Sequence, residues 1–500
     1  MKPEHPFAAR ADRRLSSWLA AGACAALALA AGCAVGPDYQ RPAVSTPAAY
    51  KETAAWKPAA PNDAAPRGAW WEAFQDPVLS GLELQAAASN QTLLQAAANY
   101  EAARQIARAD RAQLWPSLTA DGSANRSKSP GLPRSPTGYS ASLEAGWQPD
   151  FWGSVRRQTE SDVASAQASA AALASSRLSL QATLAEDYIE LRISDENVRL
   201  LQNSIEAYQH SLLITQNKYS VGVSARSDVI EAQTQVDSTR AQLIGVGVQR
   251  AQLEHAIAVL IGKVPANFAI GPRSSLGLSQ VEVPAELPSA LLERRPDIAQ
   301  AERQVATTNA KIGVQTAAYF PTVQLSADGG YSGTPLARLF NAPEQMWSLG
   351  SQLSESLFDA GQRRDLVAAA RADHVASVAN YRGVVLGAFQ QVEDGLVGIR
   401  ILAQQTAAEA AAVAEASQAA RIALNEYNAG TVDYTTVVTA QVTELNNRET
   451  ALNITQSRLT TAVALMTALG GGWDAQELPG KNQILARRSA AGASLGVAAD

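Results

Sequence analysis

The chain has 500 residues, of which 46% are hydrophobic but only 6% aromatic, and alanine dominates the apolar share. Such a composition favours long, closely packed helices over a compact enzyme core. A formal net charge of -6 without a basic stripe argues against a nucleic-acid binder, and two cysteines with four scattered histidines argue against a disulfide framework or a structural zinc site.

The first 32 residues have the features of a bacterial signal peptide. Basic residues precede an uncharged stretch from Leu15 to Ala31, which is too short for a comfortable membrane span. Small residues then lead into Cys33, a pattern that resembles the lipobox of bacterial lipoproteins, with Ala30 where leucine is usual. We expect Cys33 to carry N-palmitoyl and S-diacylglycerol groups at the head of a Pro/Ala-rich segment, 33–67. An ordinary cleavage site beside an incidental cysteine is the alternative.

The rest of the chain contains the same landmarks twice. A Tyr-x-x-Gly stretch at 219–222 recurs at 427–430, an offset of 208 residues, and a Trp-Pro step at 115–116 recurs as Phe-Pro at 320–321, an offset of 205. Two further pairs of landmarks keep the same order and nearly the same offset. Because chance hardly supplies four such pairs, we predict a tandem repeat. The predicted units are a first repeat at 68–265, a linker at 266–281 and a second repeat at 282–472.

Each repeat begins with a helical stretch, 77–113 or 289–318, which the proline step brings to an end. Apolar and polar residues then alternate strictly, as in strands with one apolar face. Their length of about ten residues suits a tilted transmembrane strand. The four predicted strands are 116–126, 138–149, 321–332 and 346–357.

Long proline-free tracts follow the strands, at 150–264 and 344–478. Their apolar residues recur with the three- and four-residue steps of a heptad seam. A helix over 154–219 would be roughly 100 Å long, far longer than a globular domain needs. Gly222 and Gly430 are placed to end one helix and to return the chain along the next. Each repeat is therefore predicted to contain two strands and one long antiparallel helical hairpin.

Four amphipathic strands cannot close a membrane barrel by themselves. An open sheet edge in lipid leaves backbone groups without partners, so several chains would have to pool their strands, eight from a dimer or twelve from a trimer. The outward face lacks a continuous aromatic girdle, so a soluble sandwich stays open as an alternative. The export signal and the predicted lipid anchor favour the membrane.

The chain resembles the NodT-type outer-membrane efflux lipoproteins, relatives of TolC. The resemblance implies an α+β membrane protein: a trimer with a twelve-stranded β-barrel in the outer membrane and a long α-helical barrel in the periplasm. It also implies an exit duct of a tripartite efflux system, lipid-anchored, with a periplasmic adaptor (membrane fusion) protein and an inner-membrane transporter of the RND type. The stretches that carry the resemblance are Cys33–Pro42, Trp70–Pro77, Asp150–Arg156, Leu287–Ile298, Ala318–Pro321 and the two Tyr-x-x-Gly turns.

In such proteins the periplasmic helix tips form an aperture that can close, and the Tyr-x-x-Gly turns lie there. The resemblance makes Tyr219, Asp228, Tyr427 and Asp433 candidates for gate or pore-lining positions. A trimer would place three copies of each carboxylate around one axis, an arrangement that favours cations. Packing or capping at helix ends is the alternative role. Val432 occupies the position of a gate arginine in TolC, so that salt-bridge lock is not carried over.

An enzyme is the first rival function. The sequence contains neither a Gly-rich phosphate loop nor a G-x-S-x-G elbow, and its histidines lie singly on predicted helices. The Glu186-Asp187 pair is more typical of a solvated helix face than of an acid/base dyad. We therefore predict neither catalysis nor a cofactor nor a bound metal.

A periplasmic adaptor or an envelope scaffold lipoprotein is the second rival. Adaptors also have lipid anchors and long hairpins, but they usually carry one hairpin between β-rich flanks, so the duplicated plan favours the channel. Residues 294–297, Arg-Arg-Pro-Asp, are expected to start a helix with local ion pairs, a structural role. The tail, 473–500, is rich in Ala, Gly and Ser and is expected to be disordered.

Overall fold

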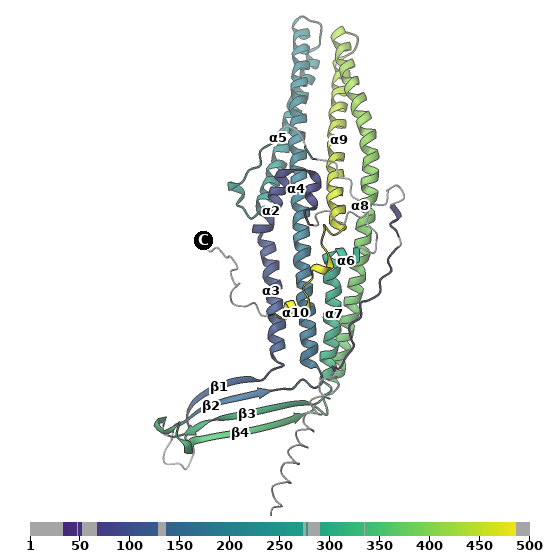
Figure 1. Cartoon of the computed structure of the whole chain (residues 1–500). Helices are drawn as coiled ribbons and strands as arrows, with labels where there is room; N and C mark the ends of the chain where they lie inside the picture. Colours follow the sequence, from purple (N-terminus) through teal and green to yellow (C-terminus); the bar gives the residue numbers. More distant parts are fainter. Residues whose placement is uncertain are drawn as a thin grey trace, which may run out of the picture.

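A computed structural model of the chain contains a helical body and one sheet of four strands (Figure 1). The predicted signal peptide and Cys33 lie outside the described residues. Among the described helices, none combines the length and the apolar character that a membrane crossing requires. The structure describes residues 34–47, 49–52, 68–128, 137–273, 277–278, 291–334 and 336–486.

The same order of elements occurs twice. The predicted strands are confirmed with bounds within three residues of those expected, and both helical hairpins lie inside the predicted tracts 150–264 and 344–478. The first series is α2 (Pro77–Ser89), α3 (Gln91–Ala112), β1 (Ser117–Arg126), β2 (Thr137–Trp147), α4 (Ser154–Ser220) and α5 (Arg226–Leu260). The second series is α6 (Leu291–Arg294), α7 (Pro296–Ala317), β3 (Thr322–Gly333), β4 (Gln345–Ser354), α8 (Gln362–Ala429) and α9 (Tyr434–Ala468).

Each of the predicted helical stretches, 77–113 and 289–318, contains a break, and the second break falls where residues 294–297 were expected to start a helix. The first break is at Asn90, whose Oδ1 accepts a hydrogen bond from the N–H of Leu93 at 2.9 Å. Its Nδ2 donates to the carbonyl oxygen of Leu260, also at 2.9 Å. The break at Asn90 was not predicted: a local cap starts α3, and a second hydrogen bond to a residue far along the chain stabilises the break further.

The second break is at Arg295, where Pro296 starts α7. The local ion pair expected in this stretch is present, since Arg295 Nη2 lies 2.6 Å from Asp297 Oδ2. Arg295 Nη1 also donates to the carbonyl oxygen of Ala468 at 3.1 Å. The guanidinium thus ties the start of α7 to the end of α9.

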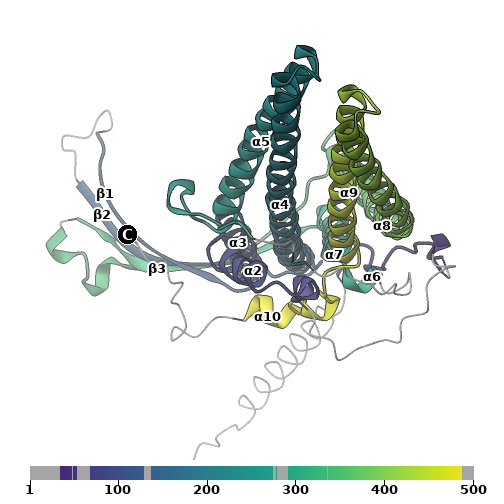
Figure 2. The same ribbon diagram turned by 90° about the horizontal axis from the view of Figure 1, so that it is seen from above.

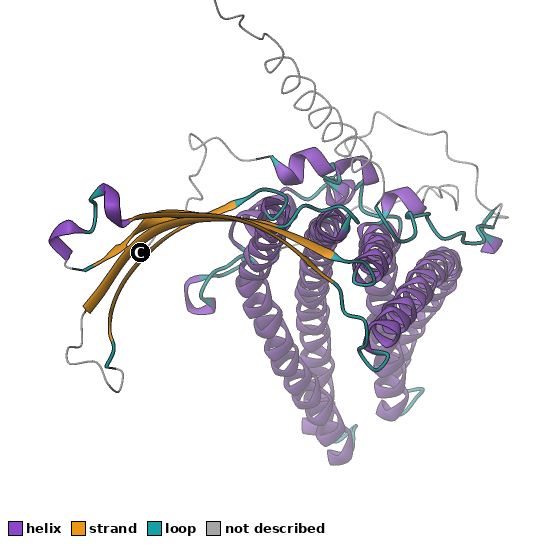
Figure 3. Ribbon diagram, turned by 90° about the horizontal axis from the view of Figure 1, so that it is seen from below, coloured by secondary structure: helices purple, strands orange, loops and turns teal. Residues whose placement is uncertain are grey.

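The four strands form one antiparallel sheet in the order β1-β2-β3-β4, curved as Figures 2 and 3 show. Side chains of paired residues share a face, and the register makes one face mainly apolar and the other mainly polar. The row Leu118, Ala145, Ala327, Leu349 is typical of the apolar face, and the row Thr119, Glu144, Asp328, Ser348 of the polar face. The predicted alternation is confirmed over most of the sheet, whereas Arg126, Gln345 and Ser351 place polar side chains on the otherwise apolar face.

All four strands join the helical body at one end of it. The helices that contact each other give the lateral order α3-α4-α7-α8 near the sheet and α5-α4-α9-α8 at the opposite end (Figure 1). α4 and α8 run through both parts, with 67 and 68 residues. Apolar clusters lie between the helices; the largest of them contains Leu184, Ile189 and Ile257 and packs α2, α4 and α5 together.

A buried polar network anchors the start of α2. Asp76 Oδ1 accepts hydrogen bonds from the N–H groups of Val78 and Leu79, at 2.8 and 3.2 Å. Its Oδ2 accepts a hydrogen bond from the Tyr188 hydroxyl at 2.8 Å and lies 2.6 Å from Arg273 Nη1. Burial raises the pKa of Asp76, but these hydrogen bonds and the Arg273 charge outweigh it, so the net pKa is lowered.

Glu83, on the buried face of α2, differs from Asp76 in having a buried carboxyl group without hydrogen-bond partners among the described residues. Its side chain is 1% exposed, and neither carboxyl oxygen has a hydrogen-bond partner among the described residues. Burial raises the pKa of Glu83 to about 9. The folded protein therefore holds this carboxyl protonated at neutral pH, whereas the unfolded chain ionises it above about pH 4.5.

Replacing Glu83 with Gln is expected to stabilise the protein at neutral and basic pH. Because folding takes up a proton at Glu83, its contribution to stability falls as pH rises from about 4.5 to about 9. The Gln variant should be more stable by about 3 kcal/mol at pH 7, and the difference should shrink toward pH 4.5. Thermal unfolding of both proteins between pH 5 and 9 measures this, and parallel pH profiles would contradict it.

The end of the chain corrects one expectation. The predicted disorder from Trp473 onward is wrong up to residue 486, where α10 (Lys481–Leu485) packs onto α3 and α4. Ile484 and Leu485 are buried in an apolar cluster there, and Arg108 Nε donates to the Ile484 carbonyl at 3.0 Å. The Ala/Gly/Ser-rich composition of the tail gave no indication of this packing, which depends on the two apolar residues alone. Residues 487–500 lie outside the described residues.

Candidate functional site

The two helical hairpins turn at the end of the body far from the sheet, and the turns have the same geometry. Gly222 and Gly430 have φ values of 78° and 77°, in the left-handed region. The N–H after each glycine bonds back into the preceding helix, from Val223 to Lys218 at 2.9 Å and from Thr431 to Glu426 at 3.0 Å. Both glycines therefore lie between two antiparallel helices with the positive φ that a tight turn requires.

A set of contacts connects the two hairpins at their tips. Tyr427, at the end of α8, is 5% exposed, and Lys218 Nζ of α4 lies 4.1 Å from the centre of its ring. Lys218 Nζ also donates to the Tyr427 carbonyl oxygen. The hydroxyls of Tyr427 and Ser224 are 3.1 Å apart, and Ser224 donates to Asp228 Oδ2 at 2.6 Å. We call Lys218, Ser224, Asp228 and Tyr427 the tip latch.

Apolar packing supports the tip latch from below. The rings of Tyr427 and Tyr434 meet edge to face, with centroids 5.2 Å apart, and Ala232 and Val437 complete a buried cluster. Burial raises the pKa of Tyr434, so its hydroxyl stays neutral. Val432, at the position of the TolC gate arginine, packs against this cluster. The tips are thus held by a cation–π contact and hydrogen bonds over an apolar base.

The four candidate gate residues do not come together in the chain. Asp228 and Tyr427 belong to the tip latch, whereas Tyr219 is 46% exposed and Asp433 is exposed at the N-terminal end of α9. Asp433 makes no side-chain capping hydrogen bond. The gate role of all four stays a prediction. Lys218 was missed, although a basic residue in the last turn of a helix is a recognised signal for contacts with carbonyl oxygens.

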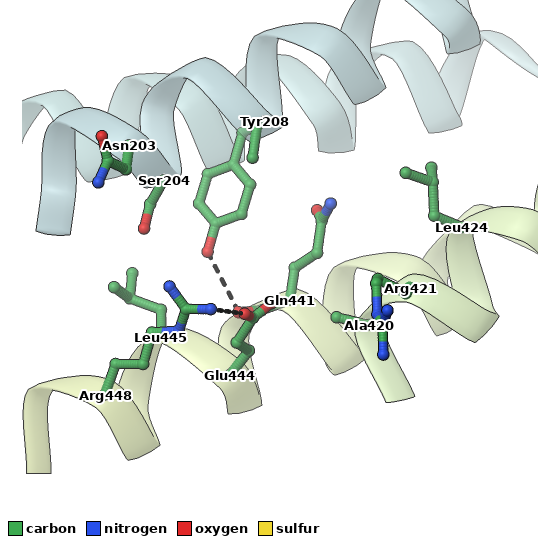
Figure 4. Close-up of a pocket in the computed structure, with 11 residues that line it drawn as sticks. Asn203, Ser204, Tyr208, Ala420, Arg421, Leu424, Gln441, Glu444, Leu445 and Arg448 are labelled. Atoms are coloured by element: carbon green, nitrogen blue, oxygen red, sulfur yellow. Dashed lines mark hydrogen bonds and ion pairs between the residues drawn. The ribbon is translucent and has the colours of Figure 1, made fainter. Parts of the chain in front are cut away.

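A groove of about 230 Å³, lined by both polar and apolar side chains, lies farther from the tips between α4, α8 and α9 (Figure 4). The Tyr208 hydroxyl donates to the Gln441 carbonyl oxygen at 3.1 Å, and Arg448 pairs with Glu444 at 2.6 Å. Burial raises the pKa of Tyr208 to about 12. The described residues contain no group of three or more His, Cys, Asp or Glu side chains arranged to hold a metal ion.

The N-terminal segment is fixed at the opposite end of the body, beside the sheet. The N–H of Val35 donates to the carbonyl oxygen of Trp152 at 3.0 Å, in the connection from β2 to α4. Arg157 of α4 is 5% exposed; it donates to the Val35 carbonyl at 3.1 Å and pairs with Asp38 at 2.8 Å. Residue 34 therefore lies where the strands end and the helices begin.

Comparisons with known proteins agree with this architecture. The model of the outer membrane efflux protein family matches residues 84–263 and 287–471. A probable efflux pump outer membrane protein of Pseudomonas putida, TtgC, is 31% identical over 452 residues, covering 88% of this chain and 93% of TtgC. CusC of Escherichia coli, a cation efflux system protein, is 29% identical, covering 90% of this chain and 98% of CusC.

A solved structure extends the likeness to the fold. The outer-membrane channel OprN superposes with a TM-score of 0.81 at 28% sequence identity, covering 88% of this chain and 100% of OprN. The likeness spans both the sheet and the helical body, because nearly all of the described chain is covered. The chain belongs to the outer membrane efflux protein family.

Proposed function

We propose that the chain is the exit channel of a tripartite efflux system, passing small molecules from the periplasm to the exterior without chemistry of its own. The observation that carries this proposal is the sheet: one face is mainly apolar, the other is mainly polar, and both edges are open. Such a sheet is suited to a barrel wall with lipid outside and water inside. Its direct continuation into two long hairpins supplies a duct beyond the membrane.

Closure of the barrel requires several copies. Three chains would supply twelve strands and close the edges that β1 and β4 leave open, with the helices of three chains forming a periplasmic barrel. The element series that occurs twice in each chain supports two tandem repeats, 68–265 and 282–472. In the resulting homotrimer each repeat contributes one sixth of the wall.

The energy for transport comes from partners. Relatives of the chain carry names of efflux pumps, and CusC is named for a cation efflux system. For this chain we propose a periplasmic adaptor and an inner-membrane transporter of the RND type. The duct itself is a wide polar passage, so the transporter selects the cargo.

A lipid anchor at Cys33 fits the position of the N-terminal segment. Hydrogen bonds hold Val35 beside Trp152, where the strands end, so acyl chains on Cys33 would enter the membrane at the level of the strand ends. The N-terminal segment thus joins the anchor to the helical body. We place the protein in the outer membrane, lipid-anchored, with a long periplasmic extension.

The tip latch would then hold the periplasmic entrance closed. It lies at the end of the body far from the sheet, and its contacts bring the end of α8 against α4 and the turn that follows α4. Parting these contacts would release the tips of the two hairpins from each other without unfolding either hairpin. Tyr219 and Asp433 are exposed beside the latch, where they could line an opened entrance.

Fractionation and native mass measurement test the proposal. The protein should appear in the outer-membrane fraction, incorporate radioactive palmitate, and have the mass of three chains after extraction in mild detergent. Cys33→Ser should abolish the labelling while leaving the trimer mass unchanged. A stable monomer in detergents that preserve known trimeric porins would contradict the channel, and labelling of the Ser variant would contradict the anchor.

A further inference from the structure

The connection between β3 and β4 lies at the end of the sheet far from the helical body (Figures 1 and 3). It contains two short 3-10 turns, Leu336–Arg338 and Ala342–Glu344. If the sheet is part of a barrel wall in the outer membrane, this end faces the exterior, so the role inferred for it rests on the proposed function.

The β3–β4 connection folds back onto the apolar face of the sheet. Tyr331 follows Ala327 at an even spacing in β3, which places its side chain on that face. The rings of Phe340 and Tyr331 meet edge to face, with centroids 5.5 Å apart. Glu344 Cγ lies 3.1 Å from the position of a Cβ added at Gly333, and Gly333 has the same parity as Tyr331. Two separate contacts thus place the connection on the face that would meet lipid.

Two apolar side chains of this connection are exposed. Leu336 and Phe340 are 56% and 70% exposed, whereas Leu339, between them, is 4% exposed. Leu339 therefore serves the packing of the connection itself. Because Phe340 lies against Tyr331, the exposed pair extends the apolar face past the end of the strands. Acyl chains that cover the sheet would reach this pair as well.

The charged residues of the sheet are divided between its polar face and its far end. The polar face carries every acidic residue of the four strands: Asp121, Glu144 and Asp328. The basic residue of the strands, Arg126, ends β1 and lies on the apolar face. Lys128 follows it, and Arg338 lies in the β3–β4 connection; all three are exposed. Among the described residues at this end, three cations accompany one carboxylate, that of Glu344, in a chain with a net charge of -6.

The ends of β1 and β3 lie close enough together for one ligand. Both strands pair with β2, so their backbones are about 10 Å apart. Arg126 pairs with Thr137 and Gly333 with Tyr139, so the two strand ends are level within two residues of β2. A headgroup that carries two phosphate groups can therefore reach both connections at once.

We propose that Arg126, Lys128 and Arg338 bind the phosphate groups of an anionic glycolipid of the outer leaflet, while Leu336 and Phe340 contact its acyl chains. We call these five residues the rim patch. Guanidinium and ammonium groups bind phosphate through charge-assisted hydrogen bonds, and basic residues beside an apolar membrane surface attract anionic headgroups. Closure of the β3–β4 connection over the mouth of the duct is the competing arrangement, which its contacts on the apolar face oppose.

Binding of lipid A, a phosphorylated glycolipid, to the detergent-solubilised trimer tests the proposal by native mass measurement. The variant with Arg126→Ala, Lys128→Ala and Arg338→Ala should bind lipid A roughly a hundredfold more weakly than the wild type, since each basic residue at an anionic lipid surface contributes about fivefold. The matched control, Arg364→Ala, removes a side chain that is 79% exposed just after β4, at the opposite end of the sheet, and should bind like the wild type.

The outcomes separate the rim patch from the channel. All three replaced side chains are exposed, so the triple variant should fold and form the trimer. A trimeric triple variant that binds lipid A as tightly as the wild type would overturn the rim patch and leave the exit channel intact. A wild type that is monomeric would overturn both.

Two further ligands and one variant test the parts of the rim patch. Lipid A without its phosphate groups should bind the wild type as weakly as lipid A binds the triple variant. Inorganic phosphate should not displace lipid A; displacement would assign the cations to free phosphate and overturn the glycolipid. Phe340→Ser should weaken lipid A binding roughly tenfold through the lost acyl contact. Leu213→Ser, at a residue 54% exposed on α4, is its control, and equal binding by these two variants would overturn the acyl contact.

Discussion

Alanine in place of Asp76 is expected to lower the free energy of unfolding by about 4 kcal/mol. The substitution removes a buried charge and leaves its hydrogen-bond donors without an acceptor. The N–H groups of Val78 and Leu79, the Tyr188 hydroxyl and Arg273 all lose their acceptor at once. Urea unfolding of the detergent-solubilised protein, followed by tryptophan fluorescence, measures the change. Asp76→Asn keeps an acceptor for the helix cap but loses the charge opposite Arg273, so its loss should be smaller.

The same residue should give the protein an acid-sensitive component of stability. The pKa of Asp76 is lowered below its usual value of 3.8, so its contribution to stability is fully present above that value and is lost as pH falls through the folded-state pKa. The alanine variant should therefore approach the wild type in strongly acidic buffer. A variant as stable as the wild type at pH 7 would contradict the role of the network.

The second large effect is expected at the tip latch. Tyr427→Ala removes the ring below Lys218, the hydroxyl beside Ser224 and the contact with Tyr434. Loss of a buried aromatic side chain costs about 3 kcal/mol, which would raise the ratio of open to closed tips roughly hundredfold if the closed state alone makes these contacts. The time-averaged current through single channels in planar bilayers should rise accordingly.

Two further variants separate the contacts at the tip. Tyr427→Phe keeps the ring and loses only the hydroxyl near Ser224, so its open fraction should lie between those of the wild type and the alanine variant. Tyr219→Ala removes a side chain that is 46% exposed and outside the latch, and should leave the closed state unchanged. An alanine variant at Tyr427 with wild-type current would show that the latch does not close the channel.

The sequence predicted the repeated strands and hairpins because their signals are local and periodic. The strict alternation of apolar and polar residues in β2 and β3 indicates strands with one apolar face. The heptad steps in α4 and α5 indicate a pair of long packed helices. Gly222 and Gly430 supplied the two positions with positive φ, so the turns followed from residue type. These features depend on neighbours within a few residues.

The features that the sequence did not predict depend on distant partners. The break at Asn90 is stabilised by Leu260, and Lys218 meets Tyr427 across 209 positions of the chain. The C-terminal segment is ordered because Ile484 and Leu485 find an apolar site on α3 and α4. Composition and periodicity contain no information on such pairings, so the tip latch could be inferred only in part, through Asp228 and Tyr427.

Single-channel recording of the purified protein in planar lipid bilayers tests the central claim most directly. A trimer with a closed periplasmic entrance should insert in discrete steps of small, long-lived conductance, and Tyr427→Ala should enlarge the current at each step without changing the trimer mass. Protein that is monomeric and silent under all voltages, in both the wild type and the Tyr427 variant, would contradict the exit channel.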